Sequence, residues 1–171
     1  MMFQSSWEIF EGPVDMKFSG FDSHPELTGN TLQLRPLRQA DYSNLFAAAS
    51  KPEIWAGHPA KDRYKPEVFE PYFQFLLKNG GTLVAIDQQS EQIIGCSRYY
   101  ASPDQADSIA IGFTFLDSDY WGGTTNFEFK QLMLDHALKS FPEVWFHIDP
   151  TNIRSQKATA KLGATPVYDA T

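Results

Sequence analysis

Cysteine is nearly absent from this chain of 171 residues, which has Cys96 as its one thiol. A single thiol excludes an intramolecular disulfide and a cysteine-based zinc site. Basic residues are also few, because 14 lysines and arginines stand against 21 aspartates and glutamates and give a net charge of −7. An acidic chain repels phosphate backbones at long range, so we expect no nucleic-acid partner and note that a cationic partner would suit this charge.

Long apolar runs and an export signal are missing as well. No apolar run approaches the roughly 20 residues that cross a bilayer, and residues 1–12 lack a basic region and contain Glu8 and Glu11. We therefore expect no membrane association and a cytoplasmic location. The chain is 42% hydrophobic and 15% aromatic, which excludes the intrinsically disordered class.

The apolar pattern predicts one α/β domain, residues 31–171, after an irregular N-terminal arm, residues 1–30, that is rich in glycine and proline. Four helices are expected. The first begins at Asp41, and the other three cover Pro66–Asn79, Asn126–Phe141 and Asn152–Leu162. The expected strands are Leu32–Leu37, Thr82–Ile86, Ile93–Tyr100, Ile109–Leu116, Val144–Ile148 and Thr165–Tyr168.

The strand Ile109–Leu116 has one large and one small face. Strict alternation places Ile109, Ile111, Phe113 and Phe115 on one side, and Ala110, Gly112 and Thr114 on the other. A small face lets another group approach the backbone, either a packed helix or a ligand.

A glycine-rich join connects this strand to the next helix. Gly122 and Gly123 precede Thr124, Thr125 and Asn126 at the helix start. Unpaired N–H groups and the helix dipole favour an anion there, whereas the alternative is an ordinary turn with a helix cap. The spacing matches neither a P-loop nor a dinucleotide fingerprint.

The segment from Asn152 is a second candidate. Asn152 can cap the helix that follows, and Arg154, Lys157 and Lys161 lie close together in an acidic protein. These three cations form either a solvated face or a phosphate contact.

These two segments and their order resemble the GNAT superfamily of acetyl-CoA-dependent N-acetyltransferases, in particular its ribosomal-protein N-terminal acetyltransferase branch. The resemblance covers Thr31 to Thr171 and is carried by five pieces: L-R-P-L at Leu34–Leu37, I-I-G at Ile93–Gly95, I-G-F at Ile111–Phe113, Y-W-G-G at Tyr120–Gly123 and N-x-x-S…K-L-G at Asn152–Gly163. It implies a single α+β domain with a mixed, mostly antiparallel sheet that is splayed at the cofactor site and has helices on both faces.

The resemblance also implies a site for acetyl-CoA, the acyl donor. The pantetheine arm would lie between the strand ending near Leu116 and the strand Val144–Ile148, the pyrophosphate on Gly122–Asn126, and Asn152 would hold a pantetheine amide. The implied cofactor-binding residues are Phe115, Leu116, Trp121, Gly122, Gly123, Thr124, Thr125, Asn126, Asn152, Arg154, Ser155 and Lys157.

The chain departs from the family pattern in three places. The second glycine of the turn is displaced, a frequently used glutamate is replaced by Ala110, and the tyrosine that serves many members as the acid for the thiolate is replaced by Thr159. Ser155 matches a serine that takes this acid role in the resembling branch. The base that deprotonates the amine is left open between His147 and, through water, Asp107.

The chain ends earlier than the family pattern, which would leave a sheet edge beside the site unpaired. We expect the N-terminal arm or a second copy, as a homodimer, to cover it, or else a more open acceptor pocket. We expect no metal, because His58 and His136 lack ligand partners at useful spacing.

The function that follows is transfer of acetyl from acetyl-CoA to a primary amine, either a small molecule or a peptide N-terminus. The alternatives are a catalytically weakened acyl-CoA-binding module of the same fold and a purely structural domain.

Overall fold

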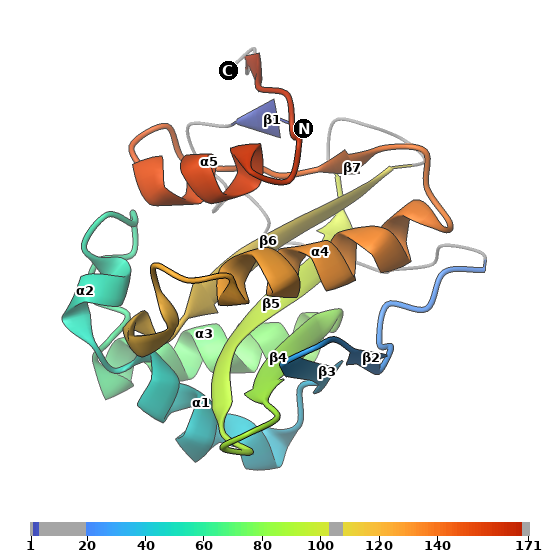
Figure 1. Ribbon diagram of the computed structural model, residues 1–171. Helices are drawn as coiled ribbons and strands as arrows, with labels where there is room; N and C mark the ends of the chain where they lie inside the picture. Colours follow the sequence, from blue (N-terminus) through green and yellow to red (C-terminus); the bar gives the residue numbers. More distant parts are fainter. Residues whose placement is uncertain (1, 4–19, 103–107, 169–171) are drawn as a thin grey trace.

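The computed structural model describes residues 2–3, 20–102 and 108–168, and its centre is a six-stranded sheet (Figure 1). The strand order is β2-β3-β4-β5-β6-β7, with antiparallel neighbours except for the parallel pair β6 and β7. The strands are β2 (Leu27–Thr28), β3 (Leu32–Pro36), β4 (Thr82–Asp87), β5 (Ile93–Ala101), β6 (Ile109–Leu116) and β7 (Val144–Trp145). This is the mixed, mostly antiparallel sheet of an α+β domain that the family resemblance implies.

Helices cover both faces of this sheet. Figure 1 draws α4 (Thr125–Leu138) in front of the strands, with α1 (Tyr42–Ala49) and α3 (Pro66–Asn79) behind them. The short helix α2 (Pro52–Trp55) follows α1, and α5 (Ile153–Ala160) follows β7. Two 3-10 turns, η1 (Gln39–Asp41) and η2 (Ser118–Tyr120), precede α1 and α4.

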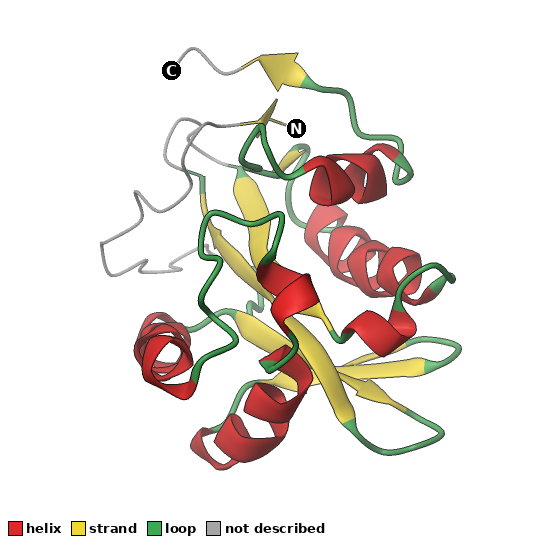
Figure 2. Cartoon of the chain, turned by 90° about the vertical axis from the view of Figure 1, so that its left-hand side faces the viewer, coloured by secondary structure: helices red, strands yellow, loops and turns green. Residues whose placement is uncertain are grey.

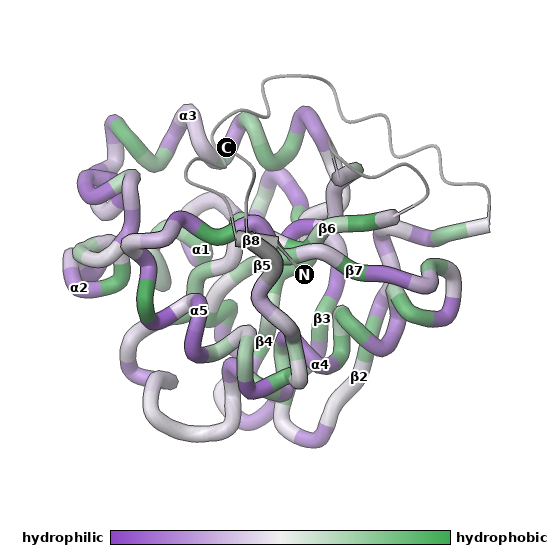
Figure 3. The backbone as a smooth tube through the Cα atoms, turned by 90° about the horizontal axis from the view of Figure 1, so that it is seen from above, coloured by the Kyte–Doolittle hydropathy of each residue, from purple (hydrophilic) through white to green (hydrophobic). Residues whose placement is uncertain are grey.

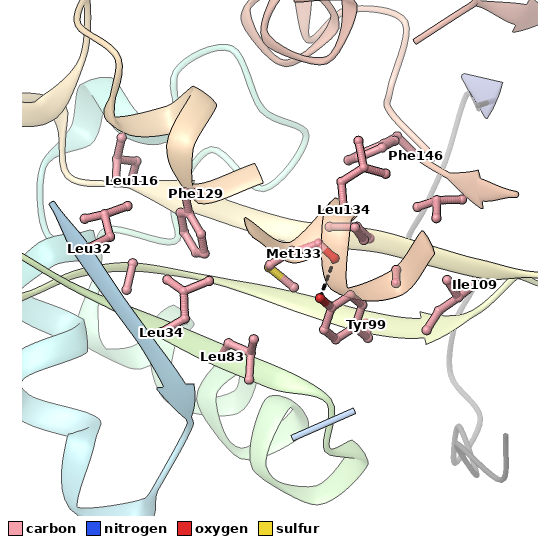
Figure 4. Packing of buried hydrophobic residues seen from close by; sticks show 14 of the residues in the cluster. Leu32, Leu34, Leu83, Tyr99, Ile109, Leu116, Phe129, Met133, Leu134 and Phe146 are labelled. Atoms are coloured by element: carbon pink, nitrogen blue, oxygen red, sulfur yellow. Dashed lines mark hydrogen bonds between the residues drawn. The ribbon is translucent and has the colours of Figure 1, made fainter. Parts of the chain in front are cut away.

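The sheet separates two apolar cores. On the α4 side, Phe129 and Met133 pack against strand residues such as Leu34 and Leu83, and the Tyr99 hydroxyl donates to the Met133 carbonyl at 2.6 Å (Figure 4). On the other side, α3 places its apolar stripe against the strands. Alternating hydrophobic and hydrophilic segments along α3 are visible in Figure 3, as expected for a helix with one face in the core and one in water.

The chain ends form a second, two-stranded sheet. The backbone of β1 (Met2–Phe3) pairs in parallel with β8 (Val167–Tyr168), at one end of the molecule (Figure 2). The N-terminal segment therefore pairs with the last strand, but not with β7, which is the last strand of the main sheet. Of the alternatives left open for the edge at the chain's last strand, the described residues show the N-terminal arm pairing with β8, whereas they show no strand of the arm on β7.

Most predicted elements agree with the structure to within a few residues. The predictions for Pro66–Asn79 and Ile109–Leu116 match α3 and β6 at both ends. The arm predicted as irregular contains the short strand β2, and α2 has no counterpart among the predicted elements. None of the helices in the described part of the chain is both long and apolar enough to cross a membrane.

Candidate functional site

Strands β6 and β7 are paired only at one end. The pairing is limited to Ile109 with Val144 and Ala110 with Trp145. The predicted strand Val144–Ile148 is therefore too long, because residues 146–148 leave the sheet while β6 continues to Leu116. We call the opening between residues 111–116 and residues 146–148 the fork. Within the described chain, no strand pairs with residues 111–116 of β6 on the side that faces the fork.

A β-bulge in β6 accompanies the fork. Between the pairs Cys96–Phe115 and Arg98–Gly112, β6 contains one residue more than β5, and Phe113 adopts a φ of +55°. A bulge bends its strand and increases the local twist, which separates the end of β6 from its neighbour. The Tyr72 hydroxyl donates to the Phe113 carbonyl at 3.1 Å and stabilises this conformation.

The same bulge overturns the strict alternation predicted for this strand. Ile111 and Leu116 both belong to the core under α4. Strict alternation would put them on opposite faces, and the extra residue in the bulge puts them on the same one. Phe113, however, packs against Phe75 with ring centroids 5.5 Å apart, and Phe115 packs on the same side of the sheet. Because the bulge adds one residue, the side chains that follow it point to the opposite face of the sheet from the one that alternation predicts.

Two adjoining cavities occupy the fork and its mouth. The smaller, about 30 Å³, lies between β6 and residues 146–148. The larger, about 270 Å³, extends from the end of β6 to the start of α4 and to α5. Its lining includes ten of the predicted cofactor-binding residues: Phe115, Leu116, Trp121, Gly122, Gly123, Asn126, Asn152, Arg154, Ser155 and Lys157. Thr124 and Thr125 belong to the same turn but do not line it.

The turn before α4 is held by side chains at its beginning. Asp117 accepts hydrogen bonds from its neighbour Asp119 N at 3.0 Å and from Lys51 Nζ at 2.7 Å. The Trp121 indole donates to the Leu116 carbonyl at 3.0 Å, which fixes its ring at the cavity wall. Gly122 then takes a φ of +81°, a conformation that glycine adopts without steric cost.

The start of α4 has the features of an anion site. Thr124 makes no side-chain hydrogen bond to the first turn. The carboxylate of Glu128, the acidic residue of that turn, is bound instead to the backbone N–H groups of Thr31 and Leu32, both at 2.9 Å. The first turn of α4 therefore has no cap from Thr124 or from the Glu128 carboxylate, and Gly122, Gly123 and Asn126 of this helix start line the larger cavity.

Asn152 caps α5, as one of its two interpretations predicts. Its Oδ1 atom accepts from Ser155 N at 3.3 Å, so the side-chain amide nitrogen is the part of Asn152 left for a ligand. The helix it starts presents Arg154, Lys157 and Lys161 to the larger cavity. The guanidinium carbon of Arg154 lies 3.2 Å from the ring centroid of Trp121, so that the two side chains form a cation–π pair at the cavity wall.

The predicted catalytic residues both reach the fork. Ser155 lines both cavities, and His147, which is 4% exposed, lines the smaller one with its Nε2 atom 3.3 Å from Ser102 Oγ. His58, which lines both cavities, accepts from Ala60 N through Nδ1, and burial together with nearby Arg63 lowers its pKa to about 3. His58 is therefore neutral at pH 7. The other base candidate, Asp107, lies outside the described residues.

Lys130 is the site residue that sequence reasoning missed. It is 4% exposed, it lines both cavities, and burial lowers its pKa to about 8. Its Nζ atom lies 3.4 Å from the hydroxyl of Thr159 and 5.5 Å from the ring centroid of Phe146. The helical spacing of Lys130 with Met133 and Leu134 was the available signal, since it puts the lysine on the buried stripe of α4.

Comparisons with known proteins agree on one family. The family model described as an acetyltransferase (GNAT) domain matches residues 31–165. Among solved structures, an acetyltransferase of the GNAT family from Bacillus anthracis aligns with a TM-score of 0.66 at 17% identity, covering 81% of this chain and 82% of that one. A putative acetyltransferase from T. thermophilus aligns with a TM-score of 0.63 at 25% identity, covering 82% and 75%.

A third structure concerns the branch named above. The ribosomal-protein-S5-alanine acetyltransferase from Vibrio fischeri aligns with a TM-score of 0.56 at 19% identity, covering 81% of this chain and 82% of that one. A search of the curated proteins found no match. At identities below 25%, such a likeness concerns the fold.

Proposed function

Because this chain belongs to the GNAT acetyltransferase family, we propose that it transfers the acetyl group of acetyl-CoA to a primary amine. The products are an N-acetyl amide and free CoA. The fork, the start of α4 and the cationic side of α5 are the parts of the chain that would hold the donor.

The observation that carries this proposal is the charge of the larger cavity. Arg154, Lys157 and Lys161 line the larger cavity alone, and no aspartate or glutamate of the described chain lines either cavity. The whole chain has a net charge of −7. A concentration of cations beside a helix N-terminus in an acidic protein favours a ligand with several phosphates.

The shape of the site suits the rest of the donor. The backbone groups of β6 that face the fork have no strand partner in the described chain, so they can pair with the amides of an extended pantetheine arm. The Asn152 amide nitrogen would donate to the same arm. The pyrophosphate would lie on the N–H groups of residues 122–126, with Arg154 and Lys157 beside it.

The chemistry needs a neutral amine, a polarised thioester carbonyl and a proton for the leaving thiolate. His147, next to the smaller cavity, is the proposed base for the amine. Ser155, which the family resemblance suggests as the acid, lines both cavities and is within reach of a group bound there.

The first experiment is calorimetric titration with CoA, followed by an assay of CoA release with a thiol reagent. The acceptor panel contains small primary amines, polyamines and peptides with different N-terminal residues. We expect saturable CoA binding and turnover with one class of acceptor. Absence of CoA binding would contradict the proposal for the site, and binding without any turnover would contradict the proposed activity. The cytoplasmic location and a homodimer stay predictions.

A second candidate function is a catalytically weakened acyl-CoA-binding module. The observation that favours it is the lack of a carboxylate in the lining of either cavity among the described residues, which leaves His147 as the base. Saturable binding of acetyl-CoA, with no acetyl transfer to any acceptor and no thioester hydrolysis, would identify this module.

A further inference from the structure

Lys130 is a buried ammonium group that has no counter-ion among the described residues. None of the ion pairs found in the described chain includes it, and its polar contact is the long one of 3.4 Å with the Thr159 hydroxyl. A lysine buried in this way is unfavourable for folding, because its charge loses water without gaining a carboxylate. Such a residue calls for a reason beyond packing.

Its position relates it to the reacting part of the donor. Of the residues that line both cavities, Lys130 is the one that carries an ammonium group, and it lies where the fork opens into the larger cavity. The other titratable groups lining these cavities are His58, His147, Arg154, Lys157 and Lys161. Arg154, Lys157 and Lys161, which are spread along α5 and its C-cap, line the larger cavity alone, whereas Lys130 also lines the smaller one.

We propose that Lys130 is the acid of the transfer reaction and donates a proton from Nζ to the CoA sulfur as the carbon–sulfur bond breaks. This inference rests on the proposed function. The amine nitrogen forms a bond to the acetyl carbon, the bonding pair of the broken bond moves to sulfur, and the proton from Lys130 converts the thiolate to a thiol. The proton lost by the amine goes to the base, and Lys130 regains its proton from solvent.

The acidity of Lys130 suits this step. Its pKa of about 8 is close to that of an ordinary thiol, roughly 8.5, so the proton transfer is nearly balanced in free energy. At pH 7 about nine-tenths of such a group is protonated and ready to donate. Ser155 is the competing assignment, and a serine hydroxyl is a much weaker acid than an ammonium group of this kind.

The test measures the acidity of the bound CoA thiol and does not depend on turnover. The thiolate is followed by its ultraviolet absorbance during a pH titration of the CoA complex, with the desulfo-CoA complex as the blank. In the wild type, we expect the ammonium of Lys130 to lower the pKa of the bound thiol by about one unit or more. In Lys130→Met this lowering is lost. The control is Lys139→Met, at the exposed end of α4. It also removes one lysine charge, but the pKa of the bound thiol should stay lowered as in the wild type.

Kinetics then separate a proton donor from a fixed charge. Lys130→Met should reduce kcat about 100-fold while the Kd of acetyl-CoA changes by less than about threefold, as expected for loss of a general acid. Lys130→Arg keeps a charge that does not dissociate, so it should keep the lowered thiol pKa without restoring kcat.

Three results would overturn the assignment. The first is a bound-thiol pKa that is the same in Lys130→Met as in the wild type. The second is full activity in Lys130→Arg, and the third is loss of the thiol pKa shift in Ser155→Ala alone. Each would show that Lys130 is not the proton donor. Calorimetry separates these results from a failure of the proposed function. A wild-type protein that does not bind CoA contradicts both the proposed function and the role of Lys130. A protein that binds CoA but leaves the pKa of the bound thiol unchanged contradicts the role of Lys130 alone.

Discussion

Removing the Lys130 charge should stabilise the empty protein. Its ammonium is buried, and its pKa is about 8 where an exposed lysine has about 10.5. Since a tenfold change in proton affinity corresponds to about 1.4 kcal/mol, the folded state is destabilised by about 3 kcal/mol at neutral pH. Methionine has a similar length and no charge, so Lys130→Met should recover most of this free energy.

The pH dependence has a definite sign. Below pH 8, Lys130 is protonated in the folded and the unfolded chain, and the full cost of burial applies. Between pH 8 and 10.5, the unfolded chain binds more protons than the folded one, so the stability of the wild type rises with pH relative to the variant. The advantage of Lys130→Met therefore falls toward zero over this window.

Urea unfolding of both proteins from pH 7 to pH 10 measures this difference. Tyrosines that titrate at high pH are common to the two proteins, and their effect cancels in the comparison. At pH 7, the variant should melt about 6–12 °C higher, since 1 kcal/mol moves the Tm of a domain of this size by about 2–4 °C. The exposed Lys139→Met variant should show no such trend. The reasoning is refuted if Lys130→Met is less stable than the wild type at pH 7, or if the difference does not change with pH.

Three further predictions concern the cavity wall and the core. Measured by calorimetry, Arg154→Met should raise the Kd of CoA about tenfold and leave the Kd of S-acetylpantetheine unchanged, because S-acetylpantetheine has no phosphates. An equal rise in both Kd values would instead indicate that the substitution acts through lost packing on Trp121. Cys96, which is fully buried with a pKa raised to about 12, should react with a thiol reagent only after unfolding, and rapid labelling of the native protein would contradict its burial. Gly122→Ala should lose about 1–2 kcal/mol in chemical denaturation because its φ is +81°, whereas Gly123→Ala, in equally open space but without a positive φ, should lose nothing; equal losses would exclude the backbone explanation.

Features set by residues close together in the chain were predictable. The proline in the first turn and the Asn-Gly-Gly sequence at the end define Pro66–Asn79 as a helix, and α3 has these bounds. The glycine-rich join and the Asn152 cap are also local, and the structure puts both at helix starts that border one cavity. Local patterns carry this information because hydrogen bonds and caps within a helix join residues three or four positions apart.

Tertiary structure alone decided how these pieces form a site. The bulge at Phe113 depends on how β6 pairs with β5 and on a hydrogen bond from Tyr72, which lies far away in the sequence, in α3. No pattern within residues 109–116 predicts it. The helical spacing of Lys130 puts it on the apolar stripe of its helix. Only the packing of α4 on the sheet, with Thr159 of α5 beside Nζ, decides that its ammonium is buried next to the fork. The sequence thus determined the elements and their order through short-range interactions, while the shape and the charge of the cavity arose from contacts between segments far apart in the chain.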